Sequence, residues 1–115
     1  MLTRPRWEAE VRLMQNVFPS FEPFAEPGAW AGFRGWLRGV RTGCLYQVVL
    51  RASISTFPSE EPAVYMNPRP ESHHWIHDGR LCYVRDGHVW NPAEDTFAQA
   101  LIIAVKYLNE FDGQG

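Results

Sequence analysis

The sequence has few lysines, few cysteines and no long apolar stretch. Lys106 is the single lysine beside ten arginines, and the 115 residues carry a formal net charge of −2. Without a basic block, the chain lacks the broad electrostatic footprint of nucleic-acid-binding proteins. No apolar run approaches the ~20 residues of a membrane-spanning helix, and the N-terminus has no apolar signal-peptide core. Two cysteines do not make a disulfide framework, so we expect a protein of the reducing cytoplasm. Because a basic block and a long apolar run are missing, we also expect that it binds neither nucleic acid nor a membrane.

The chain does have enough apolar surface for a folded core. Hydrophobic residues make up 45% of it and aromatic residues 14%, which is more than disordered chains carry. A chain of this length can bury one core but not two. We therefore expect a single domain that spans residues 1–115.

Residues 4–18 fit an amphipathic helix. Thr3 is suited to cap this helix and Pro5 to lie in its first turn. The apolar residues at helical spacing are Trp7, Val11, Met14 and Phe18. Pro19 ends the helix, and the proline-rich segment that runs to Gly28 predicts a loop.

Residues 44–55 are the clearest strand in the chain. Alternate positions from Cys44 to Ile54 are apolar, which is typical of a strand with one buried face. A glycine-flanked turn connects this strand to residues 30–39 and predicts a hairpin. Cys44 lies on the apolar face, where a free cysteine behaves as a small hydrophobe, so we interpret it as structural. Residues 63–66 predict a further short strand.

Residues 67–92 show no regular pattern, and a loop of this length in a compact domain is usually functional. A final helix follows, with Asn91 as its cap or, about one turn later, Thr96. Its predicted apolar face consists of Phe97, Leu101, Ile102, Val105 and Leu108. Gly113 marks its end. The order of elements predicts an α+β fold, in which an N-terminal helix, a three- or four-stranded antiparallel meander, a long loop and a C-terminal helix follow one another.

The residue types alone leave three interpretations of Cys82 open. As a nucleophile, its thiol would be activated by a neighbouring arginine or protonated histidine. As a metal ligand, it would join His73 and His77 around zinc, with His74 or His88 as the fourth ligand of a structural site. As a structural residue, it would pack beneath the loop while the histidines form hydrogen bonds.

The spacing around Cys82 resembles that of the ubiquitin-conjugating enzyme family, and in particular its bacterial branch. In that family a glycine lies three positions before the catalytic cysteine, and a Trp-x-Pro motif begins eight positions after it. This sequence has Gly79 and Trp90-Asn91-Pro92 at the same offsets from Cys82. The segment FPSEEP, residues 57–62, resembles the family's FP…P break, and the stretch from His73 to DGRLC is similar to bacterial members.

The resemblance implies a minimal ubiquitin-conjugating fold and an enzyme that needs no cofactor or metal of its own. An activating enzyme would adenylate the C-terminus of a ubiquitin-like protein, or of another protein, which would then pass to Cys82 as a thioester and from there to an amine. In the bacterial antiviral systems that such proteins resemble, the acceptor would be a host protein or a nucleotide second-messenger synthase. The alternatives are an interaction module that binds a ubiquitin-like partner without catalysis, and a small zinc-binding domain.

One family motif is missing from this sequence. Eukaryotic members have a His-Pro-Asn motif whose asparagine lies eight residues before the cysteine and is thought to support the oxyanion. Here Ser72-His73-His74 occupies these positions. From this offset we expect His74 to donate a hydrogen bond to the oxyanion, and His77 or His73 to accept the proton of the attacking amine. The expected catalytic residues are therefore Cys82, His74, His77 and His73.

Overall fold

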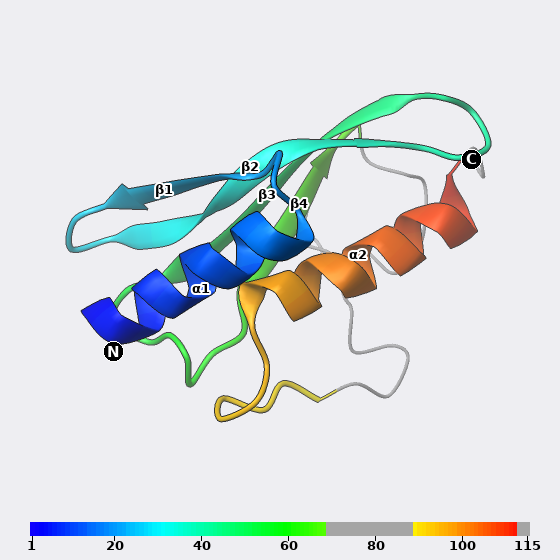
Figure 1. Ribbon diagram of the computed structural model, residues 1–115. Helices are drawn as coiled ribbons and strands as arrows, with labels where there is room; N and C mark the ends of the chain where they lie inside the picture. Colours follow the sequence, from blue (N-terminus) through cyan, green and yellow to red (C-terminus); the bar gives the residue numbers. More distant parts are fainter. Residues whose placement is uncertain (69–88, 113–115) are drawn as a thin grey trace.

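A computed structural model of the chain describes residues 1–68 and 89–112. A helix, four strands and a second helix follow one another, which confirms the predicted α+β fold (Figure 1). The elements are α1 (Arg4–Val17), β1 (Glu22–Glu26), β2 (Trp30–Arg38), β3 (Leu45–Ser53), β4 (Ala63–Asn67) and α2 (Phe97–Phe111). The strands form one antiparallel sheet in the order β1-β2-β3-β4, so each strand pairs with its neighbours in the sequence.

Helix α1 begins at the predicted residue. Thr3 Oγ1 accepts a hydrogen bond from Arg6 N at 3.3 Å, as the side chain of a helix cap does. Pro5 lies in the first turn, where a backbone N–H has no partner within the helix. The four residues of the predicted apolar face all belong to the core or pack against it: Trp7, Val11, Met14 and Phe18.

The segment after α1 forms a strand, so the predicted loop in this region is wrong. β1 pairs with β2 from Glu22 opposite Arg34 to Glu26 opposite Trp30. The proline content of the segment pointed to a loop, but β1 is an edge strand, where a proline such as Pro23 is tolerated. Charged side chains at both of its ends are typical of such an edge.

The predicted hairpin is confirmed, with β2 and β3 paired from Trp30 opposite Ser53 to Arg38 opposite Leu45. The buried residues of β3 alternate along the strand: Tyr46, Val48, Leu50 and Ala52. Cys44 is half-buried and packs against the core, as its structural interpretation required. The short strand predicted at residues 63–66 is β4.

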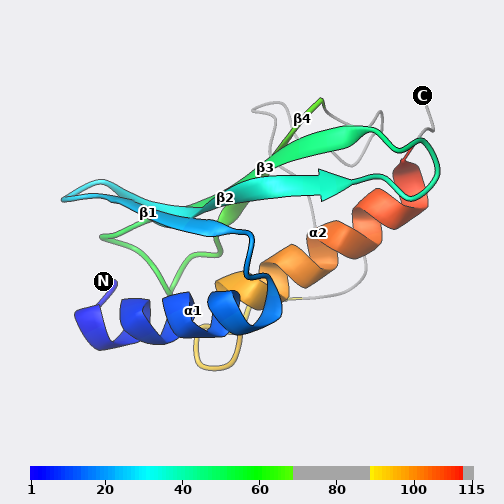
Figure 2. The same cartoon turned by 45° about the horizontal axis from the view of Figure 1, so that its top comes forward.

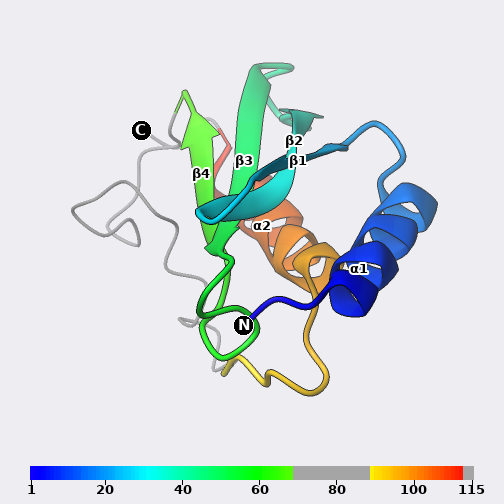
Figure 3. The same cartoon turned by 90° about the vertical axis from the view of Figure 1, so that its left-hand side faces the viewer.

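Both helices lie against the same face of the sheet, and the opposite face turns away from them (Figure 2). Contacts between aromatic rings connect α1, α2 and the sheet. Phe97 at the start of α2 lies 5.2 Å from Phe33 of β2 and 4.9 Å from Phe57, measured between ring centroids. Trp7 of α1 lies 5.2 Å from the ring of Phe33. This cluster binds α1, α2 and the sheet into one core. Figure 3 shows the arrangement of the two helices and the sheet from another side.

Helix α2 begins at Phe97, so the cap at Asn91 is wrong and the alternative cap, Thr96, is confirmed. Thr96 Oγ1 accepts a hydrogen bond from Gln99 N at 3.1 Å. Asn91 instead begins a separate turn, in which its carbonyl oxygen accepts a hydrogen bond from Asp95 N at 2.8 Å. A polar residue followed by proline suits both kinds of turn, so the sequence pattern did not separate them.

The buried face of α2 differs in part from the predicted one. Its buried residues are Phe97, Ala98, Ala100, Leu101, Ile103, Ala104, Tyr107 and Leu108. Ile102 and Val105 were predicted on this face and are only half-buried. Small alanines at positions 100 and 104 let the helix approach its neighbours closely, which a prediction based on large apolar residues does not capture.

The end of α2 carries a buried carboxylate that the sequence analysis did not single out. Asp112 accepts hydrogen bonds from Arg41 N at 2.8 Å, from Thr42 N at 3.0 Å, from Thr42 Oγ1 at 2.7 Å and from Tyr46 OH at 2.8 Å. Burial alone would raise the pKa of Asp112, but these hydrogen bonds outweigh it and lower the pKa from 3.8 to about 2. Burial and the neighbouring carboxylate raise the pKa of Tyr46 to about 12. Asp112 therefore ties the end of α2 to the turn between β2 and β3, where Gly39 has no Cβ to overlap it.

This carboxylate predicts a specific dependence of stability on pH. Because its pKa is lower in the folded than in the unfolded chain, Asp112 stabilises the fold above about pH 4, and this contribution is lost as the pH falls towards about 2. We expect Asp112→Asn to lower the midpoint of thermal unfolding at neutral pH, and the difference from the unmodified protein to narrow below about pH 4. Thermal melts followed by circular dichroism at stepped pH measure both effects.

The matched control is Glu8→Gln, which removes an exposed carboxylate paired with Arg4. Exposed pairs of this kind contribute little, so the control should melt like the unmodified protein at every pH. A difference between Asp112→Asn and the unmodified protein that stays constant down to about pH 2 would contradict the assigned role of the carboxylate.

Candidate functional site

The four expected catalytic residues, Cys82, His74, His77 and His73, lie in residues 69–88, outside the described part of the chain. His88, the alternative zinc ligand, lies there as well. The structure describes the two flanks of this segment, which are β4 with the residue after it and the stretch from Val89 to Thr96 that leads into α2.

The first flank is held by the sheet. β4 pairs with β3 up to Asn67, which lies opposite Gln47. The segment that leads into β4 contains Phe57, a fully buried ring at the centre of the aromatic cluster. The chain therefore reaches Pro68 from a well-anchored strand.

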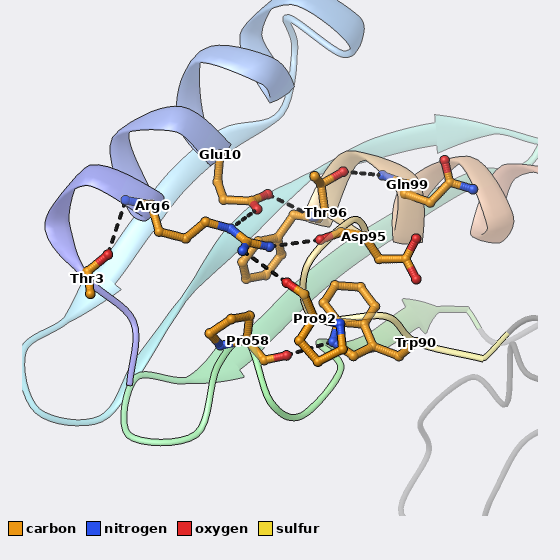
Figure 4. Close-up of polar contacts among 10 residues, drawn as sticks. Thr3, Arg6, Glu10, Pro58, Trp90, Pro92, Asp95, Thr96 and Gln99 are labelled. Atoms are coloured by element: carbon orange, nitrogen blue, oxygen red, sulfur yellow. Dashed lines mark hydrogen bonds and ion pairs between the residues drawn. The ribbon is translucent and has the colours of Figure 1, made fainter.

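The second flank is held by Trp90. The indole Nε1 donates a hydrogen bond to Pro58 O at 2.7 Å (Figure 4). The ring also lies 6.0 Å from Phe57, measured between centroids. The indole also packs against the core. Trp90 therefore has a packing role, and its contacts bring together two parts of the quoted motif, the Phe-Pro break and the Trp-x-Pro, that are 32 residues apart.

Arg6 of α1 also holds the second flank. Its guanidinium donates to Pro92 O at 3.2 Å and to Asp95 O at 2.8 Å (Figure 4). It also lies over the ring of Phe57, with 5.2 Å between Cζ and the ring centroid. Two backbone carbonyl groups of the segment 92–95 are therefore fixed by a side chain from the first helix. The guanidinium fork suits this task because its donors point in fixed directions.

Glu10 completes the arrangement from the next turn of α1. Its Oε2 accepts from Arg6 Nε at 2.8 Å, and its Oε1 accepts from Phe97 N at 2.9 Å. The second bond satisfies one of the N–H groups that a helix leaves without partners at its first turn, and a negative charge is favourable there. Glu10 is 3% exposed, so this carboxylate is buried between the two helices.

Neither Arg6 nor Glu10 was predicted as a site residue, although the sequence contains one signal for them. Glu10 lies on the same side of α1 as Trp7, Val11 and Met14, so a charged residue interrupts the apolar face. A buried carboxylate requires a partner. An arginine four residues earlier was the natural candidate for that partner.

Neither flank contains a cysteine or a histidine. Within residues 1–68 and 89–112, Cys44 is the free thiol, and it is half-buried at the start of β3 with Sγ 3.9 Å from Leu45 O. The same residues contain no cluster of three His, Cys, Asp or Glu side chains that could hold a metal ion. Among them, neither helix combines the length and the apolar character that crossing a membrane requires. Comparison with known proteins returned no matching family model, no matching curated protein and no matching solved structure.

Proposed function

We propose that this protein is a ubiquitin-conjugating-like transferase that carries a ubiquitin-like protein, or another protein C-terminus, as a thioester on Cys82 and passes it to an amine. The observation that supports this most is the contact between Trp90 and Pro58. The resemblance rests on a Phe-Pro break and a Trp-x-Pro motif that are far apart in the sequence, and these two parts pack on each other. A chance occurrence of both motifs would not require them to meet.

The arrangement of the described elements also supports the proposal. A helix, a four-stranded meander and a second helix follow in the order that the resemblance implies. The stretch with Cys82 is connected at both ends to anchored parts of the molecule. Catalysis by a positioned nucleophile depends on such anchoring, because small displacements of the reacting groups reduce the rate strongly.

The proposed chemistry needs two steps. The Cys82 thiolate attacks the thioester that links the modifier to its activating enzyme, and the cysteine thiolate of the activating enzyme leaves. An amine then attacks the new thioester carbonyl, expels the Cys82 thiolate and loses a proton. In this proposal His74 donates a hydrogen bond to the oxyanion, and His77 or His73 accepts the proton. No cofactor is required.

A surface poor in lysine is consistent with an amine-reactive intermediate. Lys106, the single lysine of the chain, lies exposed on α2. Few side-chain amines are therefore present to intercept the protein's own thioester. We place the reaction in a bacterial cytoplasm, in an antiviral or protein-modification system, where the acceptor is a host protein or a nucleotide second-messenger synthase.

The experiment that tests the proposal is reconstitution with the proteins encoded beside this gene, together with ATP, followed by a non-reducing gel. We expect a covalent adduct whose mass equals this protein plus the modifier, and we expect a thiol reagent to release it. A stable complex without a covalent bond would identify a binding module instead. Stoichiometric zinc in the purified protein, lost in His77→Ala, would identify the metal-binding domain.

A further inference from the structure

The sheet has a face that turns away from both helices (Figure 2). Residues directly opposite each other in a sheet point to the same side, so the pairing places Trp30, Arg34 and Trp36 of β2 on this face together with Arg51 of β3. Trp30 is 37% exposed and Trp36 54% exposed.

Two hollows on this face are lined by residues that the structure describes. The first surrounds Trp30 and Arg51, and its volume is about 310 Å³. The guanidinium Cζ of Arg51 lies 4.5 Å from the ring centroid of Trp30 and 5.1 Å from that of Tyr65. Within the described residues, Arg51 Nε has no hydrogen-bond partner, and Nη2 reaches Tyr65 OH only at 3.4 Å. Glu60 and Glu61 line the same hollow without forming an ion pair with Arg51 among these residues.

The second hollow surrounds Trp36, and its volume is about 370 Å³. Its lining includes Glu22, Arg34 and Gln47. Arg34 lies over the ring of Phe24, with 5.7 Å between Cζ and the ring centroid, and this contact restricts the arginine. Trp30 and Trp36 are six residues apart on one strand, which corresponds to ~20 Å.

The two hollows share one composition. Each has an exposed tryptophan, an arginine that only donates hydrogen bonds, at least one glutamate that only accepts them, and a neutral polar side chain. A ligand that satisfies both charged types at once must donate and accept at neighbouring positions. Sugar hydroxyl groups do this, and the apolar face of a sugar ring can stack on an indole.

We propose that this face of the sheet binds a neutral oligosaccharide, with Trp30 and Trp36 as the stacking residues of two subsites. Two equivalent hollows along one strand suit a ligand that repeats its unit. Single-stranded nucleic acid would also stack on tryptophan, but its phosphates would meet Glu22 in one hollow and Glu60 with Glu61 in the other. The charge pattern therefore favours a neutral polymer.

The test is titration of the full chain with hexasaccharides of glucose (β1,4 and α1,4), of mannose and of N-acetylglucosamine, followed by the indole N–H signals in NMR. We expect at least one hexasaccharide to shift the signals of Trp30 and Trp36, with an affinity that does not change with salt concentration. Trp30→Ala and Trp36→Ala should each weaken binding at least tenfold. Both side chains are exposed, so the variants should remain folded.

The matched control is Leu13→Ala, which removes a side chain that is also 37% exposed but belongs to α1. It should bind like the unmodified protein. The proposal fails if no hexasaccharide of the panel shifts either signal, or if the tryptophan variants bind normally. It also fails if oligothymidylate binds this face and loses affinity with added salt, because that result assigns the face to nucleic acid. None of these outcomes depends on Cys82.

Discussion

Cys82→Ala is expected to abolish the covalent adduct completely, while Cys44→Ala is expected to leave it intact. The chain has two cysteines, so the pair of variants assigns the thioester without further mapping. Cys44 is half-buried and packs against the core, which makes it a poor nucleophile. The measurement is the fraction of protein that forms the adduct in the presence of ATP, read from non-reducing gels.

A third variant, Cys82→Ser, makes the result chemically specific. A serine in this position would form an oxygen ester, which a thiol reagent does not release but strong hydroxylamine does. We expect an adduct that survives reduction and passes its cargo to amines much more slowly than the thioester. An adduct that persists in Cys82→Ala, or that disappears in Cys44→Ala, would move the nucleophile away from Cys82 and contradict the proposed function.

The second large effect concerns stability. Glu10→Ala is expected to reduce the free energy of unfolding by about 3–5 kcal/mol, the usual cost of removing one partner from a buried ion pair. The substitution leaves Phe97 N without its acceptor and takes the carboxylate away from the half-buried Arg6 guanidinium. Urea unfolding at neutral pH measures the change, and the dependence on urea concentration should stay the same if the folded state remains compact.

The fold offers a close control for this experiment. Glu8 also pairs with an arginine four residues earlier on α1, but both side chains are exposed, at 90% for Arg4 and 54% for Glu8. Glu8→Ala should therefore cost less than about 1 kcal/mol. If the two glutamate variants lost equal stability, the buried contact of Glu10 would not explain the effect, and helix propensity would not either, because alanine is the better helix former.

The elements that were predicted correctly are those in which the local residue pattern agrees with the packing of the element in the fold. In α1, the cap at Thr3 and the apolar spacing point to the same residues, and the structure follows both. In β3, strict alternation allows only one side of the strand to be buried. β1 escaped prediction because its place at the edge of the sheet, which makes Pro23 acceptable, is decided by pairing with β2.

The frame of the candidate site could be predicted only in part. The motif spacing singled out Trp90, and the structure shows that this residue packs through its contact with Pro58. Arg6 and Glu10 act on residues more than 80 positions away, so no local pattern names their partners. The same holds for Asp112, whose donors lie in a turn some 70 residues earlier. The two tryptophan hollows arise from strand register, which places side chains of all four strands on one surface.

The contacts of Arg6 with residues far along the chain also have a consequence for folding during synthesis. The carbonyl groups that hold this arginine belong to residues 86 and 89 positions further along the chain. A ribosome adds roughly 5–20 residues per second, so α1 leaves it on the order of ten seconds before its partners do. The β2–β3 hairpin is made within that interval, while α2, which lies on the same face of the sheet as α1, is still missing. The core therefore closes only after α2 has emerged.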